Sequence, residues 1–144
     1  MGRRVVALAA CTALLAGCGG SKKAVAPEAP RYVRSATIKC LKKHHFTVST
    51  KAKAVNFIAF TSVGGGLRAW KPKRHRKLDL IMAFGANGLD ARQTLIAIKR
   101  FARRSRIFRY RIRKSNVVVL FAYRPAGAQA EGVFGCLKTA PKAS

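Results

Sequence analysis

The cysteines and histidines of this chain are its residues with the most chemical options. Cys40 and His44 lie four positions apart, so their side chains share one side of a helix if this segment is helical. A thiol beside an imidazole can act as a nucleophile, and an enzyme that uses Cys40 and His44 is one hypothesis for the chain. The adjacent His44 and His45 point in different directions on a helix and therefore chelate one ion poorly. The sequence predicts no metal site and no cofactor.

Acidic residues are scarce, which disfavours hydrolases that work with paired carboxylates. The chain has only four, Glu28, Asp79, Asp90 and Glu131, and no motif joins any two of them. Asp90 precedes a segment with helical periodicity and has Gln93 three positions later, a pattern that predicts a helix N-cap. We therefore favour a protein without catalytic residues.

Three consecutive glycines occupy positions 64–66. Phosphate-binding glycine loops lead into a helix and carry a Lys-Ser/Thr pair at a fixed offset. Here the chain continues as Leu67-Arg68-Ala69-Trp70 and has neither feature. The glycines therefore predict a tight turn rather than a phosphate site.

Positive charge is the most unusual property of the composition. Thirty Lys and Arg against four acids give a formal net charge of +26, and an excess of this size attracts anionic partners. One basic cluster lies in a predicted loop at 71–77, and a second runs from Lys99 and Arg100 through Arg103, Arg104 and Arg106 into an alternating segment at 107–113. The predicted anion-binding residues are Lys71, Lys73, Arg74, Arg76, Lys77, Arg109, Arg111 and Arg113.

Basic and apolar residues alternate in the last part of the second cluster. On a strand, Arg109, Arg111 and Arg113 share one face, and Phe108, Tyr110 and Ile112 share the other. The apolar face would enter a core, so we expect the arginine face to meet solvent or an anionic partner. Basic faces bind phosphate polymers through counterion release, and nearby aromatic residues such as Trp70 favour single-stranded nucleic acid. A solvated surface without a dedicated ligand is the alternative interpretation.

The first 18 residues have the form of an export signal. Arg3 and Arg4 precede an apolar run at 5–16 that only Thr12 interrupts. The run is too short to span a bilayer, which needs a helix of about 20 residues, but it suits the apolar region of a signal peptide. It ends in Leu15-Ala16-Gly17-Cys18, which resembles the lipobox of bacterial lipoproteins.

The resemblance implies how this end of the chain is processed. Residues 1–17 are removed as a signal peptide, a diacylglyceryl group is attached to the Cys18 thiol, and the new amino group is open to a further acyl chain such as palmitate. Two or more acyl chains anchor a protein stably, whereas one chain gives marginal binding. We therefore expect the protein on the extracytoplasmic face of the cell membrane, held there by lipid on Cys18.

Export determines the expected state of the other cysteines. Cys11 leaves with the signal peptide and Cys18 carries lipid, so Cys40 and Cys136 remain. An even remainder in an oxidising compartment predicts a disulfide, and that bridge would leave Cys40 without a thiol for catalysis. Two buried free thiols are the alternative.

Helical and strand patterns follow a flexible linker. Residues 18–30 are rich in small residues and proline, and the twelve after Cys18 reach about 40 Å when extended. A single domain is expected at 31–144. It should have helices at 31–44 (with Pro30 near its first turn), after Asp90 and at 128–137. Strands are expected at 46–48, 55–61, 67–70, 78–84, 107–113 and 117–123, the last being central because its apolar run is unbroken.

These elements predict the α+β class, a small, mainly antiparallel sheet with about three helices packed on it. The first functional hypothesis is a membrane-anchored lipoprotein whose basic, non-enzymatic domain contacts anionic lipid headgroups or wall polymer. The second is an extracytoplasmic nucleic-acid-binding module. The enzyme that uses Cys40 and His44 is the third.

Overall fold

The computed structural model describes residues 30–71, 78–101 and 108–139. Its strands form one antiparallel sheet in the order β1-β2-β3-β5-β4. They are β1 (Thr47–Ser49), β2 (Gly66–Lys71), β3 (Leu78–Phe84), β4 (Tyr110–Lys114) and β5 (Val117–Phe121). The helices of the described segments are α1 (Arg34–Lys43), α2 (Phe57–Phe60), α3 (Gly88–Phe101) and α4 (Gly127–Gly135). The predicted α+β class is confirmed, with one short helix more than expected.

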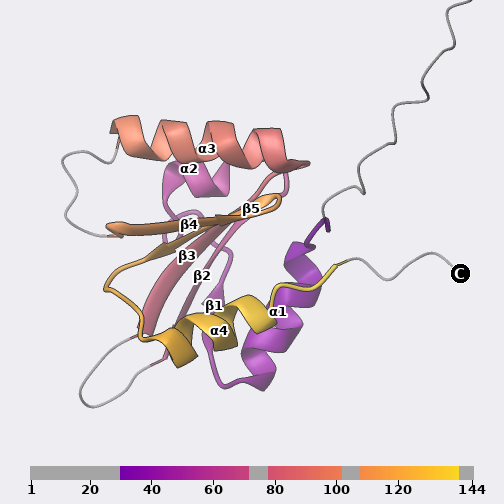
Figure 1. Ribbon diagram of the computed structural model, residues 1–144, viewed down its shortest axis with the longest axis vertical. Helices are drawn as coiled ribbons and strands as arrows, with labels where there is room; N and C mark the ends of the chain where they lie inside the picture. The colour runs from indigo at the N-terminus through magenta and orange to yellow at the C-terminus, as the bar shows by residue number, and fades with distance from the viewer. Residues whose placement is uncertain (1–29, 72–77, 102–107, 140–144) are drawn as a thin grey trace, which may run out of the picture.

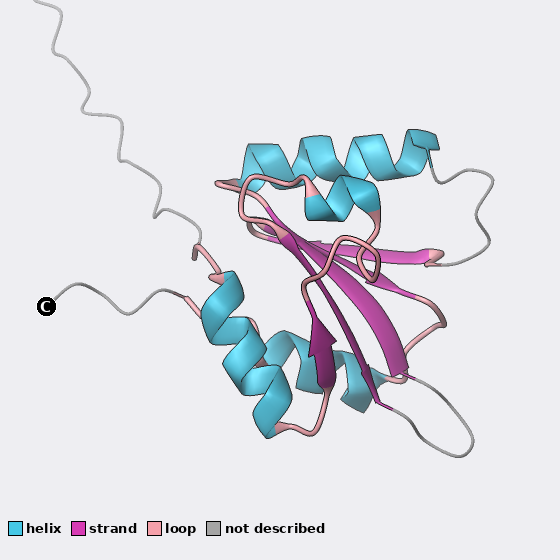
Figure 2. Cartoon of the chain, turned by 180° about the vertical axis from the view of Figure 1, so that it is seen from behind, coloured by secondary structure: helices cyan, strands magenta, loops and turns pink. Residues whose placement is uncertain are grey.

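Helices cover both faces of the sheet. In Figure 1, α2 and α3 lie above it and α1 and α4 below it, so the sheet is the middle of three layers. Figure 2 shows the same division from behind. Because both faces are covered, the central strands have no side that meets water, which decides the residue types they carry.

Alternation along the central strands fills two separate cores. On β3, Met82 and Phe84 point toward α1 and α4, whereas Ile81 and Ala83 point toward α2 and α3, and all four are buried. β5 lies between β3 and β4 and is buried along its whole length. The prediction of a central strand from its unbroken apolar run is therefore confirmed.

The segment at 55–61, predicted as a strand, instead carries α2. The Asn56 side chain accepts a hydrogen bond from the Ile58 backbone N–H at 3.0 Å, which begins the helical turn. Val55 and Ala59, four positions apart, are buried against the sheet on one side of this turn. The prediction was wrong because a β-branched and aromatic composition does not distinguish a short helical turn on a core from a strand.

α1 begins at Arg34, three residues later than predicted, and the proline expected in its first turn lies outside it. The residues before Arg34 are extended because they pair with the other end of the domain. Tyr32 forms a β-bridge with Thr139, and the Val33 N–H donates to the Lys138 carbonyl at 2.8 Å. This long-range pairing, invisible in the local sequence, overrides the helix signal.

α3 begins at Gly88 and is capped by Asn87, not by Asp90 as predicted. The Asn87 Oδ1 accepts from the Asp90 backbone N–H at 2.9 Å. The Asp90 carboxylate in turn accepts from the Ala86 backbone N–H at 3.0 Å. Asp90 is therefore the third residue of the helix, and its side chain bonds back to the backbone just before the helix. The spacing between Asp90 and Gln93 led to the wrong choice of cap residue.

The glycine run forms the predicted tight turn and leads into β2 rather than into a helix. Gly65 has a φ of 73°, a conformation that residues with a Cβ disfavour. A Cβ at Gly66 would lie 2.5 Å from the Ala59 carbonyl oxygen. The missing side chain is what allows α2 to lie directly against the start of β2.

β4 begins at Tyr110, later than predicted, and the first residue of the expected strand lies outside the described residues. Phe108 has a φ of 61°, which breaks the extended alternation just before the strand. Phe108 consequently packs on the core that faces α3, whereas Ile112 packs on the opposite core. The predicted common face of Phe108, Tyr110 and Ile112 is therefore wrong for Phe108.

Candidate functional site

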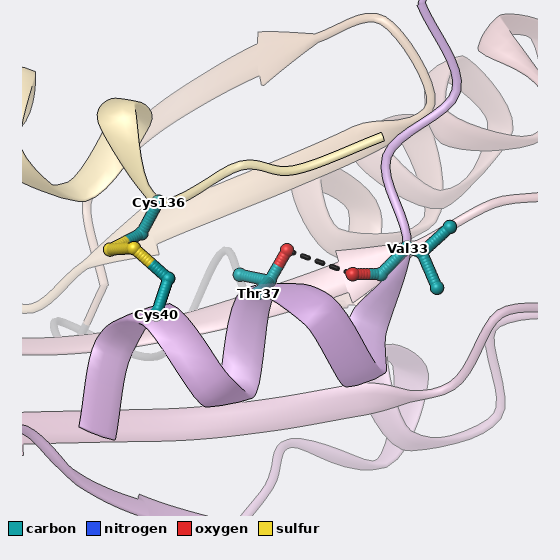
Figure 3. Close-up of a disulfide and its surroundings, with 4 residues drawn as sticks. All are labelled: Val33, Thr37, Cys40 and Cys136. Carbon is teal, nitrogen blue, oxygen red and sulfur yellow. Dashed lines mark hydrogen bonds between the residues drawn. A yellow bond between two sulfur atoms is a disulfide. The ribbon is translucent and has the colours of Figure 1, made fainter. Parts of the chain in front are cut away.

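The predicted disulfide between Cys40 and Cys136 is present. It joins α1 to the residue that follows α4, with Cα atoms 5.3 Å apart and 96 positions between the two cysteines in the sequence (Figure 3). Cys136 is buried and Cys40 is partly buried. One turn earlier, the buried Thr37 hydroxyl donates to the Val33 carbonyl at 2.9 Å. The bridge therefore closes the layer made by α1 and α4 and holds together two distant segments.

His44 lies beside this bridge. The ligand atoms of Cys40, His44 and Cys136 lie within 4.8 Å of one another, so the fold does bring Cys40 and His44 together. A cysteine acts as a nucleophile or as a metal ligand only in its thiolate form. In the disulfide neither sulfur atom is a thiolate. The cluster can perform thiol or metal chemistry only after reduction, and in the oxidised protein its role is structural.

An open hollow of about 230 Å³ lies between His44 and α4. Its lining includes His44, Phe46, Lys71 and Gln129. Lys71, at the end of β2, places its ammonium group 4.6 Å from the centre of the Phe46 ring, an attractive cation–π contact. Lys71, one of the predicted anion-binding residues, therefore packs against Phe46 on the side of the sheet that α1 and α4 cover.

The predicted arginines of β4 lie on the opposite side of the sheet from Lys71. Arg111 and Arg113 pair with Leu120 and Val118 of β5, whose side chains fill the core beneath α2 and α3. The common face predicted for these two arginines is therefore observed. It lies on the α3 side of the sheet, where Arg113 is exposed and Arg111 is partly buried, so the expected exposure holds for Arg113 and only in part for Arg111.

Both guanidinium groups have internal partners. Arg111 Nε donates to the Phe108 carbonyl at 3.3 Å. Arg113 Nη1 lies 3.3 Å from the Gly88 carbonyl and 3.4 Å from the Ser115 carbonyl. Arg109 precedes the strand and is exposed. The other predicted site residues, Cys18, Lys73, Arg74, Arg76 and Lys77, lie outside the described residues.

Acidic groups in the described segments are largely engaged. One salt bridge is found there, with Arg68 Nη2 2.6 Å and Nε 2.9 Å from the two Asp79 carboxylate oxygens. The hydrogen bond to Asp79 raises the pKa of the Arg68 guanidinium above its ordinary value and outweighs the lowering by burial. Asp90 is occupied by the α3 cap. The surface of these segments is consequently basic, with little internal neutralisation.

α2 and α3 carry a surface that was not predicted as a whole, although Lys99 and Arg100 were assigned to a basic cluster. It combines exposed apolar side chains, among them Leu89 and Ile96, with the exposed cations Arg92, Lys99 and Arg100. A signal for it was present, because Leu89 and Ile96 are seven positions apart and share one side of a helix. Which side of α3 the sheet would cover could not be read from the sequence alone.

Comparison of the chain with protein-family models, curated proteins and solved structures gave no match. Among the residues that the structure describes, no helix has both the length and the hydropathy needed to cross a bilayer. The interpretation of this protein therefore rests on its own residues and geometry.

Proposed function

We propose that this protein is a lipid-anchored extracytoplasmic lipoprotein whose basic domain, without an enzymatic role, contacts anionic envelope material. One observation carries the proposal: two arginines, a short apolar run and Leu15-Ala16-Gly17-Cys18 stand at the start of the chain. The lipobox that this pattern resembles implies cleavage before Cys18 and a diacylglyceryl group on its thiol.

The disulfide supports the export part of the proposal. Structural disulfides persist in oxidising compartments and are rare in the reducing cytosol. The fold places Cys40 and Cys136 at bonding distance although 96 positions separate them in the sequence. A pairing of this kind is what an exported domain of modest size uses to limit the entropy of its unfolded chain.

The charge supports the class of partner. Thirty Lys and Arg face only four acids, which leaves a formal net charge of +26, and anionic lipid headgroups and wall polymers both present dense negative charge. A linker of about 40 Å would keep the domain close to such a surface, at a high effective concentration. Weak contacts are then sufficient to hold it there.

Nucleic acid is a less well supported partner. A stacking platform needs an aromatic ring with an open face. Trp70 is partly buried, and the Arg68 guanidinium already lies 5.9 Å from its ring centre, held there by Asp79. For Trp70 this arrangement favours a structural contact over base stacking, whereas Tyr110 and Tyr123 are exposed.

Replacing Cys18 with Ser tests the anchor. We expect Cys18→Ser to lose acyl label and to leave salt-washed membranes, because the diacylglyceryl group needs the thiol. Cys11→Ser is the matched control, since Cys11 lies in the apolar run that processing removes. Membrane fractionation and metabolic labelling with a fatty acid provide the readouts. Equal labelling of the Cys18→Ser variant and the wild type would refute the proposed anchor.

A further inference from the structure

Exposed apolar side chains are concentrated on one layer of the molecule. Among the described residues, eight large hydrophobic side chains are exposed, and six of them belong to α2, the turn after it, or α3. They are Phe57 (76%), Phe60 (41%), Val63 (76%), Leu89 (61%), Ile96 (44%) and Phe101 (79%). Single exposed apolar residues are ordinary, but a cluster on one face marks an interaction surface.

The outward side of α3 mixes these apolar groups with cations. Ala91 and Ile98 are buried against the sheet, and Leu89 and Ile96 are exposed on the other side of the helix. Arg92, Lys99 and Arg100 are exposed on the same helix, and within the described segments none of them forms a salt bridge. α3 therefore turns a stripe of apolar and positively charged residues away from the domain.

α2 extends this stripe into a broader surface. The two helices are in contact, and a groove between them is lined by residues of both, including Ile58, Val63, Gln93 and Ala97. The single acid in the groove is Asp90, whose carboxylate is hydrogen-bonded to the Ala86 backbone. The surface made by α2, the turn after it and the outward side of α3, here named the α2–α3 face, is thus apolar and basic.

We infer that the α2–α3 face is a membrane-binding surface for a bilayer that contains anionic phospholipid. Surface-bound helices of this kind place Phe and Leu at the boundary between headgroups and acyl chains, while Lys and Arg meet the phosphates. The long stems of Arg92, Lys99 and Arg100 can lie along the apolar layer with their charges at the headgroups. The inference deepens the proposed function and rests on it only for the tether that brings the domain near the bilayer.

Charge decides between a bilayer and the other candidate occupants. In a symmetric dimer the same face of two copies would meet, and Arg92, Lys99 and Arg100 would then oppose their own counterparts. Nucleic acid would satisfy the cations but leave Phe57, Leu89 and Ile96 without an apolar partner. An anionic bilayer satisfies both kinds of side chain at once.

Vesicle binding by the unlipidated chain tests this inference separately from the anchor. A chain beginning at Gly19 keeps every residue of the described sheet, helices and disulfide, and it has no acyl group. We expect it to sediment with vesicles of equal parts phosphatidylglycerol and phosphatidylcholine, and to bind phosphatidylcholine alone far more weakly. Raising the salt should weaken the binding without abolishing it, because part of the affinity comes from apolar insertion.

Two triple variants separate the two contributions. Arg92→Gln, Lys99→Gln and Arg100→Gln together should reduce partitioning into anionic vesicles on the order of 100-fold. Lys39→Gln, Lys42→Gln and Lys43→Gln remove the same charge from α1, on the opposite layer, and should reduce it far less. Phe57→Gln, Leu89→Gln and Ile96→Gln together should reduce it about 10-fold or more, and this loss should persist at high salt. All nine positions are exposed, so folding can be checked by circular dichroism.

Three outcomes would overturn the inference. If the α1 variant loses as much binding as the α3 variant, adsorption depends on net charge and not on this face. If the apolar variant binds as the wild type does, no insertion occurs. If the unlipidated chain forms dimers that the apolar variant abolishes, and does not bind vesicles, the face is an interface between copies. None of these results bears on whether Cys18 is acylated, so the proposed anchor is judged independently.

Discussion

Replacing Cys40 and Cys136 together with alanine is expected to lower the free energy of unfolding by about 4 kcal/mol. The two residues are 96 positions apart, so the bridge closes a long loop in the unfolded chain. Its removal returns that conformational entropy to the unfolded state, and the cost rises with loop length in the chain-entropy account. Urea unfolding followed by circular dichroism measures the change.

Reduction of the wild type supplies the matched control. A phosphine reductant should lower the urea midpoint of the wild type to that of the double variant, and it should leave the double variant unchanged. Mass mapping of non-reduced protein should find the Cys40 and Cys136 peptides joined. Equal midpoints for wild type and double variant without reductant would contradict the stabilising role of the bridge.

Asn116→Ala should cost about 3 kcal/mol, an unusually large effect for a hairpin-turn residue. The Asn116 side chain is 2% exposed and makes three hydrogen bonds. Its Oδ1 accepts from the Tyr32 N–H at 2.7 Å, and its Nδ2 donates to the Tyr32 carbonyl at 3.0 Å and to the Gly85 carbonyl at 2.9 Å. Truncation leaves three backbone groups without these partners, and unsatisfied buried groups are costly.

Asn56→Ala is the comparison that isolates this effect. Asn56 is another asparagine near a turn, but it is exposed at the start of α2 and its side chain makes a single, local hydrogen bond to the backbone. Loss of such a cap costs about 1 kcal/mol. If chemical unfolding gives Asn116→Ala and Asn56→Ala the same loss, then Asn116 acts only as a turn residue and does not hold the segment around Tyr32 in place.

Those parts of the fold that depend on local periodicity were predictable. The strands at 67–70 and 78–84 appear close to their predicted bounds as β2 and β3, and the unbroken apolar run at 117–123 became the buried β5. The disulfide was predictable because the expected export signal would account for Cys11 and Cys18, which leaves Cys40 and Cys136 as a pair. In each case the information lay within one segment or in a count of residues.

The parts that failed depend on contacts between distant segments. α1 starts late because Tyr32 and Val33 pair with residues near Thr139. Asn116 does lie in a hairpin turn, but its burial could not be predicted, because it depends on the chain before α1 passing beside it. Arg111 and Arg113 share a face as predicted, but the partial burial of Arg111 depends on the layer that covers this side of the sheet, which a pattern of alternating residues cannot specify.

The candidate surface was missed for a related reason. The segment 55–61 was predicted as a strand, and only the packed layers show that Phe57, Leu89 and Ile96 lie outside the core. Lys99 and Arg100 were assigned to a basic cluster, but their place beside exposed apolar residues depends on how α3 packs on the sheet. Together with the tether proposed at Cys18, this face would allow the domain to lie flat on a membrane.

The mass of the N-terminal peptide of protein extracted from membranes tests the central claim most directly. The account predicts a peptide that begins at Cys18, lacks residues 1–17, and carries the added mass of a diacylglyceryl group on the cysteine. A peptide that retains residues 1–17, or one that begins elsewhere, or one that contains Cys18 with an unmodified thiol, would contradict it.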